Sequence, residues 1–259
     1  MSEASVHPAT RTLEGKTVVV TGASRGLGRA MARATALAGA AVVVTGRDLA
    51  ALDETVQLIG ADGVGTALPY ALDVTDAPAV ESTAAAIWEA TGGVDVVFAN
   101  AGISLTKPAR ETSIDEFDRI LKTNVNGTFS TLRAFGSRML NQGHGKLVTV
   151  ASDIGIRGSE GWVAYSASKG AVIAMTKTLA WEWAPTLTVN SIAPGAFATD
   201  INSHLLSLPE VMTAIESTTP LGRVGRSDEI GPLTVFLASA GSDFMTGQII
   251  SIDGGIQRS

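Results

Sequence analysis

The stretch VVVTGASRGLGRAMARA, residues 18–34, decides the fold. An apolar, β-branched run leads into Gly22, Gly26 and Gly28, and apolar residues at helical spacing follow. Glycine lets the backbone turn sharply from a strand into a helix, and its missing side chain lets a phosphate approach the positive end of that helix. The G-x-x-x-G-x-G spacing differs from the G-x-G-x-x-G fingerprint of dinucleotide-binding folds. A tight corner without a ligand is the alternative interpretation of these glycines taken alone.

The alternation of strand and helix continues along the chain. Short apolar runs predict strands at residues 16–22, 40–46, 66–74, 94–102, 145–152, 187–195 and 247–255. Longer segments predict helices at 26–38, 48–59, 77–90 and 113–140. Because the strand runs are apolar almost throughout, both faces of the sheet should be covered by helices. We therefore expect an α/β fold: a single-domain, doubly wound sheet of seven parallel strands with helices on both faces.

The whole chain, residues 1–259, is expected to form one dinucleotide-binding and catalytic domain, because it contains no Pro- or Ser-rich linker and no internal repeat. Residues 1–14 are expected to be a flexible tail. Residues 196–219 interrupt the alternation with an amphipathic segment, and long excursions of this kind are often lids. A small substrate lid is therefore expected there, with an apolar side formed by Ile201, Leu205, Leu208, Val211, Met212 and Ile215.

The composition argues against several classes of function. The chain has no cysteine, and His7, His144 and His204 share no metal-ligand spacing, so no metal site is expected. A net charge of −6 without a basic run argues against nucleic acid as a partner. The first residues lack an apolar signal region, and no apolar run approaches the roughly 18 residues of a membrane span. We therefore expect a soluble, cytoplasmic protein without a membrane partner.

The end of the second strand, VVVTGRD at residues 42–48, predicts which dinucleotide is bound. An acid at this position would accept the ribose hydroxyls and repel a 2′-phosphate. Gly46 stands there instead, Arg47 follows it, and Arg25 in the glycine turn is able to approach the same pocket. Arginine forms charge-assisted, bidentate hydrogen bonds with phosphate, so NADP(H) is favoured over NAD(H). Asp48 is an acid near this position and would argue against a 2′-phosphate, but it is expected to cap the following helix.

Further motifs follow in a fixed order: LDV, NAG, TNV, VAS, YSASK, IAPGAFAT, PLGRVG and TGQIISIDGG. Together with TGASRGLG at residues 21–28, they make the chain resemble the short-chain dehydrogenase/reductase family over nearly its whole length. The resemblance implies a Rossmann-like fold and an oxidoreductase that transfers a hydride between NADP(H) and a ketone or secondary alcohol, as a carbonyl reductase or alcohol dehydrogenase does. It also implies assembly as a homotetramer.

The resemblance assigns catalytic roles to Asn124, Ser152, Tyr165 and Lys169. Tyr165 is the implied acid/base, since a ketone accepts hydride at carbon and a proton at oxygen. Lys169 lies one helical turn further on and is expected to lower the tyrosine pKa and to hold the nicotinamide ribose. Ser152 would bind the substrate oxygen, and Asn124 would perturb the long helix and anchor a water. Each residue also has an alternative interpretation without catalysis. Tyr165 and Lys169 would be a solvated pair on a helix, Ser152 an ordinary serine at a strand end, and Asn124 a simple helix irregularity.

The cofactor-binding residues follow from the same resemblance and from the glycine turn. Asp73 and Val74 would line the adenine pocket, although Asp73 also fits a turn. Ala99 replaces an asparagine that the family often has at this strand tip. The full expected set is Gly22, Ser24, Arg25, Gly26, Leu27, Gly28, Arg47, Asp73, Val74, Asn100, Ala101, Gly102, Tyr165, Lys169, Pro194, Gly195 and Thr199.

The sequence predicts the substrate-binding residues less specifically than the cofactor-binding ones. The expected contacts are Ser152, Asp153, Tyr165, Phe197 and His204. Asp153 either faces a substrate hydroxyl or amine or turns away to solvent, and the second interpretation is favoured here. A free small-molecule ketone or alcohol is ranked above a carrier-bound thioester, the substrate of 3-oxoacyl-carrier-protein reductases. A cofactor sensor without chemistry, and an isomerase or dehydratase on the same scaffold, are the alternatives of other classes.

Overall fold

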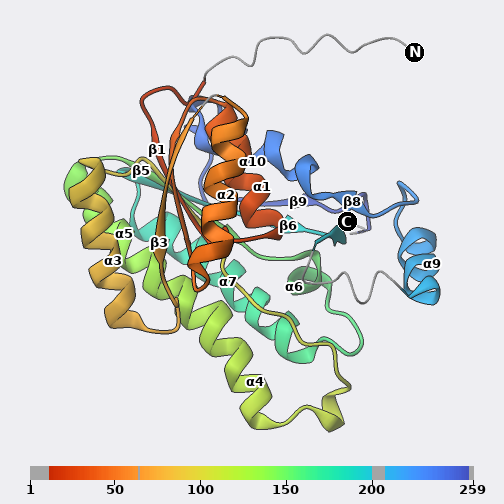
Figure 1. Ribbon diagram of the computed structural model, residues 1–259. Coiled ribbons are helices and arrows are strands. Elements are labelled where there is room, and N and C mark those ends of the chain that lie inside the picture. The colour runs from red at the N-terminus through yellow and green to blue at the C-terminus, as the bar shows by residue number, and fades with distance from the viewer. Residues whose placement is uncertain (1–11, 64, 200–207, 257–259) are drawn as a thin grey trace, which may run out of the picture.

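A seven-stranded parallel sheet forms the centre of the protein in the computed structural model, which describes residues 12–63, 65–199 and 208–256 (Figure 1). Along the sheet the strands are β3 (Thr66–Ala71), β2 (Ala41–Gly46), β1 (Thr17–Thr21), β4 (Val96–Ala99), β5 (Gly145–Val150), β6 (Leu187–Pro194) and β9 (Ile249–Ile252). All neighbouring pairs run parallel. The predicted doubly wound α/β fold is confirmed.

Successive strand residues point to opposite faces of the sheet and enter two separate cores. On β1, Val18 and Val20 pack in one core and Val19 in the other. On β4, Val96 and Phe98 belong to the first core and Val97 to the second. Both faces of the sheet are therefore shielded from water, and this explains why the strand sequences are apolar without alternation.

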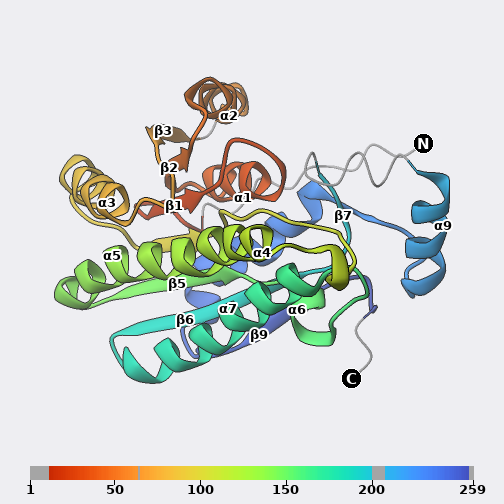
Figure 2. The same ribbon diagram turned by 90° about the horizontal axis from the view of Figure 1, so that it is seen from below.

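Helices cover both faces of the sheet. Buried residues of α1 (Gly26–Leu37), α2 (Leu49–Ala61) and α10 (Gly231–Ala238) join the first core. Those of α3 (Ala77–Thr91), α5 (Gly127–Gln142) and α7 (Val163–Glu182) join the second. Figures 1 and 2 show α4 (Ile114–Leu121), α5 and α7 side by side on this second face. Further short helical elements are η1 (Ala109–Glu111), α6 (Asp153–Arg157), η3 (Ser227–Ile230) and η4 (Ala240–Ser242).

Side-chain caps mark the start of α2 and α4. Asp48 accepts a hydrogen bond from the Ala51 N–H at 3.2 Å, so its predicted role as a helix cap is confirmed. Ser113 and Glu116 form a reciprocal capping box at the start of α4. The helix predicted over 113–140 begins there and continues to Gln142. A π-helical turn, η2 (Lys122–Asn126), separates α4 from α5 at the position where Asn124 was expected to perturb the helix.

Two features lie outside the predicted alternation. A separate parallel pair, β7 (Phe197–Ala198) with β8 (Gly225–Arg226), was not predicted. The segment expected as a lid contains α9 (Pro209–Thr218), which stands away from the central sheet in both views (Figures 1 and 2). Ile201, His204, Leu205 and Leu206 lie outside the described residues, as does the tail up to residue 11.

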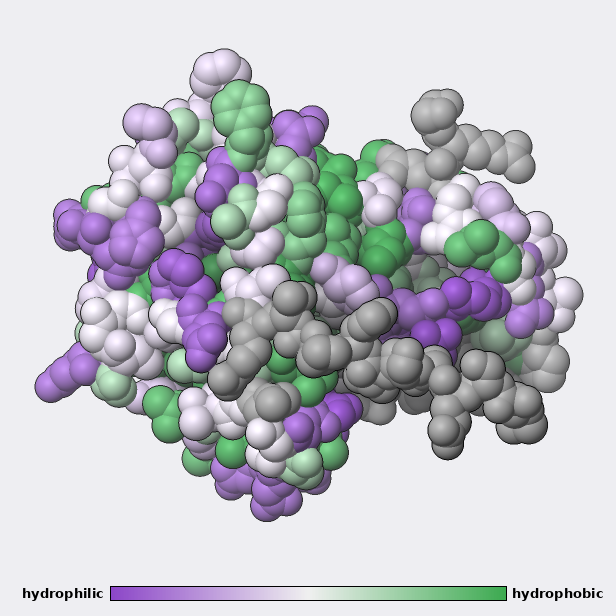
Figure 3. All heavy atoms as spheres, turned by 90° about the horizontal axis from the view of Figure 1, so that it is seen from above, coloured by the Kyte–Doolittle hydropathy of each residue, from purple (hydrophilic) through white to green (hydrophobic). Residues whose placement is uncertain are grey.

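The described helices include none that is long and apolar enough to cross a membrane. On the face seen from above, hydrophilic and hydrophobic residues are interspersed (Figure 3).

Candidate active site

A cavity of about 1240 Å³ opens at the carboxyl ends of the central strands. The chain leaves β1 toward β2 and β3 and then returns to β4 on the other side of β1, so the crevice lies where the strand order reverses. Nearly all predicted site residues line it: Gly22, Ser24, Arg25, Leu27, Gly28, Arg47, Asp73, Val74, Asn100, Ala101, Gly102, Ser152, Asp153, Tyr165, Lys169, Pro194, Gly195, Phe197 and Thr199. Gly26 and Asn124 are not among the lining residues, and His204 is outside the described residues.

The glycine turn is held in a conformation and a packing that side chains would disrupt. Gly22 and Gly26 have φ values of +67° and +56°, in the left-handed region that favours glycine. A Cβ atom on Gly28 would lie 2.2 Å from the carbonyl oxygen of Gly22, in the backbone of the turn itself. The turn therefore presents bare backbone to the cavity in front of the N-terminus of α1, as a phosphate requires.

Asn100 fixes the tip of β4 to this turn. Its Nδ2 donates to the carbonyl oxygens of Thr21 at 2.9 Å and Gly22 at 3.2 Å. The backbone N–H groups of Asn100 and Ala101 in turn donate to the Thr21 hydroxyl, at 3.0 and 3.1 Å. These four bonds join two strands at the mouth of the crevice, so Asn100 supports the geometry of the glycine turn.

Asn124 is fully buried in the π-helical turn. Its amide donates to the Ile103 carbonyl oxygen at 2.9 Å and to the Ser168 hydroxyl at 3.0 Å, and its Oδ1 accepts from the Ile103 N–H at 2.8 Å. The extra residue of the turn aims this side chain at α7 and at the loop after β4. Asn124 therefore locks together the two segments that carry Tyr165 and Gly102.

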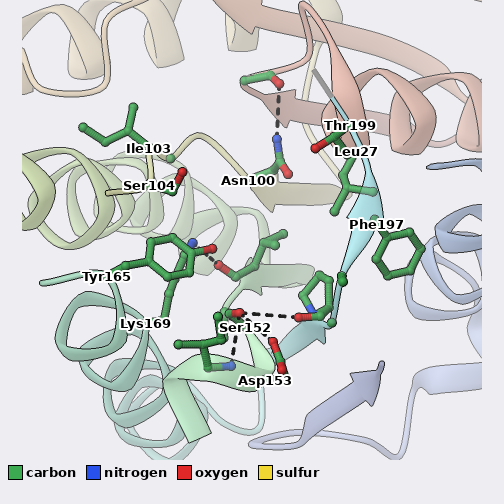
Figure 4. Close-up of a pocket in the computed structure, with 18 of the residues that line it drawn as sticks. Leu27, Asn100, Ile103, Ser104, Ser152, Asp153, Tyr165, Lys169, Phe197 and Thr199 are labelled. Atoms are coloured by element: carbon green, nitrogen blue, oxygen red, sulfur yellow. Dashed lines mark hydrogen bonds between the residues drawn. The ribbon is translucent and has the colours of Figure 1, made fainter. Parts of the chain in front are cut away.

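Ser152 follows β5 and caps α6, accepting from the Ile154 N–H at 3.3 Å. Its hydroxyl also contacts Asp153 Oδ1 at 3.1 Å and the Pro194 carbonyl oxygen at 3.5 Å (Figure 4). In the same view the Tyr165 ring lies to the side of Ser152, and Lys169 lies beneath the ring. One hydroxyl, one phenol and one ammonium group thus meet at the same wall.

Burial dominates the ionisation of Tyr165 and Lys169. Loss of water raises the pKa of Tyr165 to about 12; the Ser152 hydroxyl opposes this rise and the Asp153 carboxylate adds to it. Desolvation lowers the pKa of Lys169 to about 8. The Lys169 Nζ donates to the Val150 carbonyl oxygen at 2.7 Å and lies 5.6 Å from the centre of the tyrosine ring. The lowering of the Tyr165 pKa expected from Lys169 is therefore not seen in this structure, because desolvation acts more strongly on both groups.

Asp153 does not turn to solvent, so the interpretation favoured from the sequence is wrong. Its side chain is only 5% exposed and pairs with Arg157 Nη2 at 2.9 Å. The two residues are four apart on α6 and both line the cavity. Sequence reasoning missed Arg157, although its spacing from Asp153 was a usable signal.

The other end of the cavity carries positive charge. Arg25 and Arg47 are exposed and line the cavity, and neither forms an ion pair with a described residue. Gly46 lies beside Ser24, since a Cβ on Gly46 would stand 3.6 Å from the Ser24 hydroxyl. Asp73 accepts from the Thr75 N–H at 2.9 Å, and this bond lowers the pKa of the Asp73 carboxyl. These residues suit the phosphate and ribose of a dinucleotide.

Known proteins of similar sequence and structure also bind a dinucleotide or are named as dehydrogenases and reductases. Residues 22–257 match a family model described as Enoyl-(Acyl carrier protein) reductase. Gluconate 5-dehydrogenase from Gluconobacter oxydans is 38% identical, over 96% of this chain and 98% of that protein. A 3-oxoacyl-[acyl-carrier-protein] reductase from Thermotoga maritima is 37% identical over 94% and 98%. The crystal structure of a gluconate 5-dehydrogenase from Burkholderia cenocepacia, in complex with NADP and tartrate, superposes with a TM-score of 0.91 at 31% identity, over 96% of this chain and 97% of that one.

Proposed function

Because the chain belongs to the short-chain dehydrogenase/reductase family, we propose that it is an NADP(H)-dependent alcohol dehydrogenase or carbonyl reductase acting on a small molecule. One observation carries the proposal: Ser152, Tyr165 and Lys169 line the same cavity as the glycine turn. A dinucleotide spanning that cavity from Arg47 to Lys169 would end beside the phenol. The substrate carbonyl would then lie between the cofactor and the Tyr165–Ser152 wall.

In the proposed mechanism, the bound nicotinamide supplies or accepts the hydride at the substrate carbon. The Ser152 hydroxyl orients the substrate oxygen, and Tyr165 donates the proton to that oxygen during reduction. With a pKa of about 12 the phenol is protonated at neutral pH, so it is ready to act as the acid. Lys169, whose pKa is about 8, holds a transferable proton behind the tyrosine.

In this proposal Asn124 touches neither the substrate nor the cofactor and acts through the segments that it holds. Its bonds to Ile103 and Ser168 hold the post-β4 loop against α7, so it positions the residues that touch substrate and cofactor. It is therefore a positioning residue in the free chain.

The cofactor is NADP(H), as the relatives crystallised with NADP suggest. In this chain Arg47 and Arg25 would hold the 2′-phosphate, and the backbone of the glycine turn would hold the pyrophosphate. Arg47→Ala is expected to lower kcat/KM for NADPH by about 10- to 100-fold, because a charge-assisted phosphate contact is worth about 1.5–3 kcal/mol. Turnover with NADH should change little.

Initial rates with both nucleotides, at saturating substrate, check this prediction. Arg110→Ala is the matched control, because Arg110 is an exposed arginine that does not line the cavity. An equal loss for NADPH and NADH in Arg47→Ala would contradict the assignment of Arg47 to the 2′-phosphate.

The substrate class is best tested with a panel that separates the known kinds of relative. Simple ketones, a polyol, a sugar acid and an acetoacetyl-carrier protein are assayed by NADPH absorbance in both directions. We expect turnover of free ketones or alcohols to exceed that of the carrier-bound thioester. The reverse order would identify a 3-oxoacyl-carrier-protein reductase, and NADP(H) binding without turnover of any compound would favour a sensor.

The charge of Asp153 makes alcohol oxidation depend on pH in a predictable way. Oxidation needs the phenolate of Tyr165, and the nearby carboxylate raises the pKa of that phenol. Asp153→Asn removes the negative charge and leaves the positive charge of Arg157, so the pKa of Tyr165 should fall. The rising limb of kcat/KM against pH for oxidation is therefore expected to move to lower pH. Asp53→Asn, an exposed change on α2, is the control, and a limb that stays in place would refute the coupling.

We also propose that the protein forms a homotetramer, through α5, α7 and the edge strand β9. Large apolar side chains are exposed on or near these elements: Trp181 is 89% exposed on α7, and Phe244 is fully exposed before β9. The molar mass in solution, measured by light scattering, tests this assembly.

A further inference from the structure

One partner of an ion pair next to the proposed reacting centre, Arg157, has no role in the proton transfer described above. Asp153 and Arg157 both line the cavity, on the helix that Ser152 caps. Exposed pairs four residues apart on a helix contribute little to stability. Here the Asp153 side chain is only 5% exposed and also contacts the Ser152 hydroxyl at 3.1 Å. The pair is therefore built into the wall of the site.

The contacts of Arg157 leave one edge of its guanidinium group available. Its Nε and Nη2 both reach Asp153 Oδ2, at 3.0 and 2.9 Å, and its Nη1 donates to the Gly158 carbonyl oxygen at 3.3 Å. A guanidinium carries five N–H groups, so one on Nη1 and one on Nη2 remain after these contacts with described residues. Two N–H groups on adjacent nitrogens form the planar fork that matches a carboxylate.

The position of this fork relative to the reacting groups defines what it can bind. Asp153 bridges the two sites, since its Oδ1 contacts the Ser152 hydroxyl and its Oδ2 contacts the guanidinium. Figure 4 shows Ser152 and Asp153 on the same wall of the cavity, with Tyr165 close to them. A small molecule with its carbonyl oxygen at Ser152 and Tyr165 can therefore reach Arg157 with a group a few carbons away.

We propose that Arg157 binds the carboxylate of a small hydroxy acid or keto acid, and that Asp153 is the positioning residue that holds the guanidinium in place. This inference rests on the proposed oxidoreductase function and adds the chemical class of the substrate. A neutral polyol would need only the acceptor oxygens of Asp153 and would leave the forked edge of Arg157 unused. A carboxylate satisfies both N–H groups and brings the charge that the guanidinium complements.

The test compares two substrates of nearly equal shape, gluconate and gluconamide, as reductants of NADP⁺; the amide lacks the charge and one of the two acceptor oxygens of the carboxylate. We expect the wild-type enzyme to prefer gluconate and Arg157→Gln to lower the ratio of the two kcat/KM values by about 10- to 100-fold, the range for a charge-assisted contact. Any loss common to both substrates cancels in the ratio. Arg157→Lys keeps the charge without the fork and should restore only part of the preference. Arg110→Gln should leave the ratio at the wild-type value, since Arg110 does not line the cavity.

Several outcomes would overturn the inference. These are a wild-type enzyme without preference for the acid, an equal loss for acid and amide in Arg157→Gln, and full restoration by lysine. Calorimetric titration of gluconate into the NADPH-loaded protein, a pair that cannot exchange a hydride, makes the same comparison without turnover, and the Kd should rise about 10- to 100-fold in Arg157→Gln. An enzyme that reduces neutral ketones but ignores carboxylates refutes only the role of Arg157. Absence of any NADP(H)-dependent turnover refutes the proposed function instead.

Discussion

Tyr165→Phe is expected to lower kcat by about 100- to 10,000-fold, the usual contribution of a positioned general acid. The substitution removes the phenolic hydroxyl and keeps the ring, so the packing against Trp162, 5.6 Å away between ring centres, remains. NADPH binding should persist, because the glycine turn and Arg47 are unchanged. Steady-state rates with the best ketone of the panel, together with NADPH titration by fluorescence, separate the two effects.

The chain offers a matched control, because its only other tyrosine is Tyr70. Tyr70 lies on β3, at the edge of the sheet, and does not line the cavity. Tyr70→Phe should therefore turn over ketone like the wild-type protein. If Tyr165→Phe kept full kcat, proton donation would have to come from another group. If it lost NADPH binding as well, the defect would be structural rather than chemical.

The strands were predictable, because burial on both faces of the sheet leaves a simple signature in the sequence. Val18, Val19 and Val20 are all apolar since alternate residues enter different cores. The glycine turn was equally predictable from the sequence. A positive φ at Gly22 and Gly26 and a close backbone contact at Gly28 disfavour any other residue at these positions. In each case a local physical requirement dictates the residue type.

Interactions between distant segments were not predictable in the same way. That Asn124 perturbs the long helix was expected only from the family resemblance, because the residues of the π-helical turn give no signal of their own. The side chain of Asn124 reaches Ile103 and Ser168, so the cause of the turn is tertiary. The ionisation of Tyr165 and Lys169 depends on how much water the folded cavity excludes, which spacing on one helix does not reveal. The burial of Asp153 likewise depends on where α6 packs. The family motifs and the glycine turn predicted most residues that line the cavity, and packing decided how they interact.

Gly28→Ala is the second substitution with a large expected effect. The new Cβ would lie 2.2 Å from the Gly22 carbonyl oxygen and 2.5 Å from Asn100 Nδ2, where neither a backbone atom nor a hydrogen-bonded amide has room to yield. Overpacking of this kind costs about 1–3 kcal/mol, so Tm should fall by roughly 2–12 °C. The turn must also regain its shape to receive a pyrophosphate, so the Kd for NADPH should rise by about 5- to 100-fold. Thermal unfolding with and without NADPH measures both effects.

Gly60→Ala is the matched control for this change. Gly60 lies inside α2, and a Cβ there would meet nothing within 4 Å. Alanine is a better helix residue than glycine by about 0.5–1 kcal/mol, so this variant should be slightly more stable than the wild-type protein and should bind NADPH as well. The two glycine variants therefore move Tm in opposite directions for reasons that differ only in the space around the added methyl group. A Gly28→Ala protein with wild-type Tm and wild-type NADPH affinity would show that the turn tolerates a side chain, and the binding of a pyrophosphate by its backbone would lose its main support.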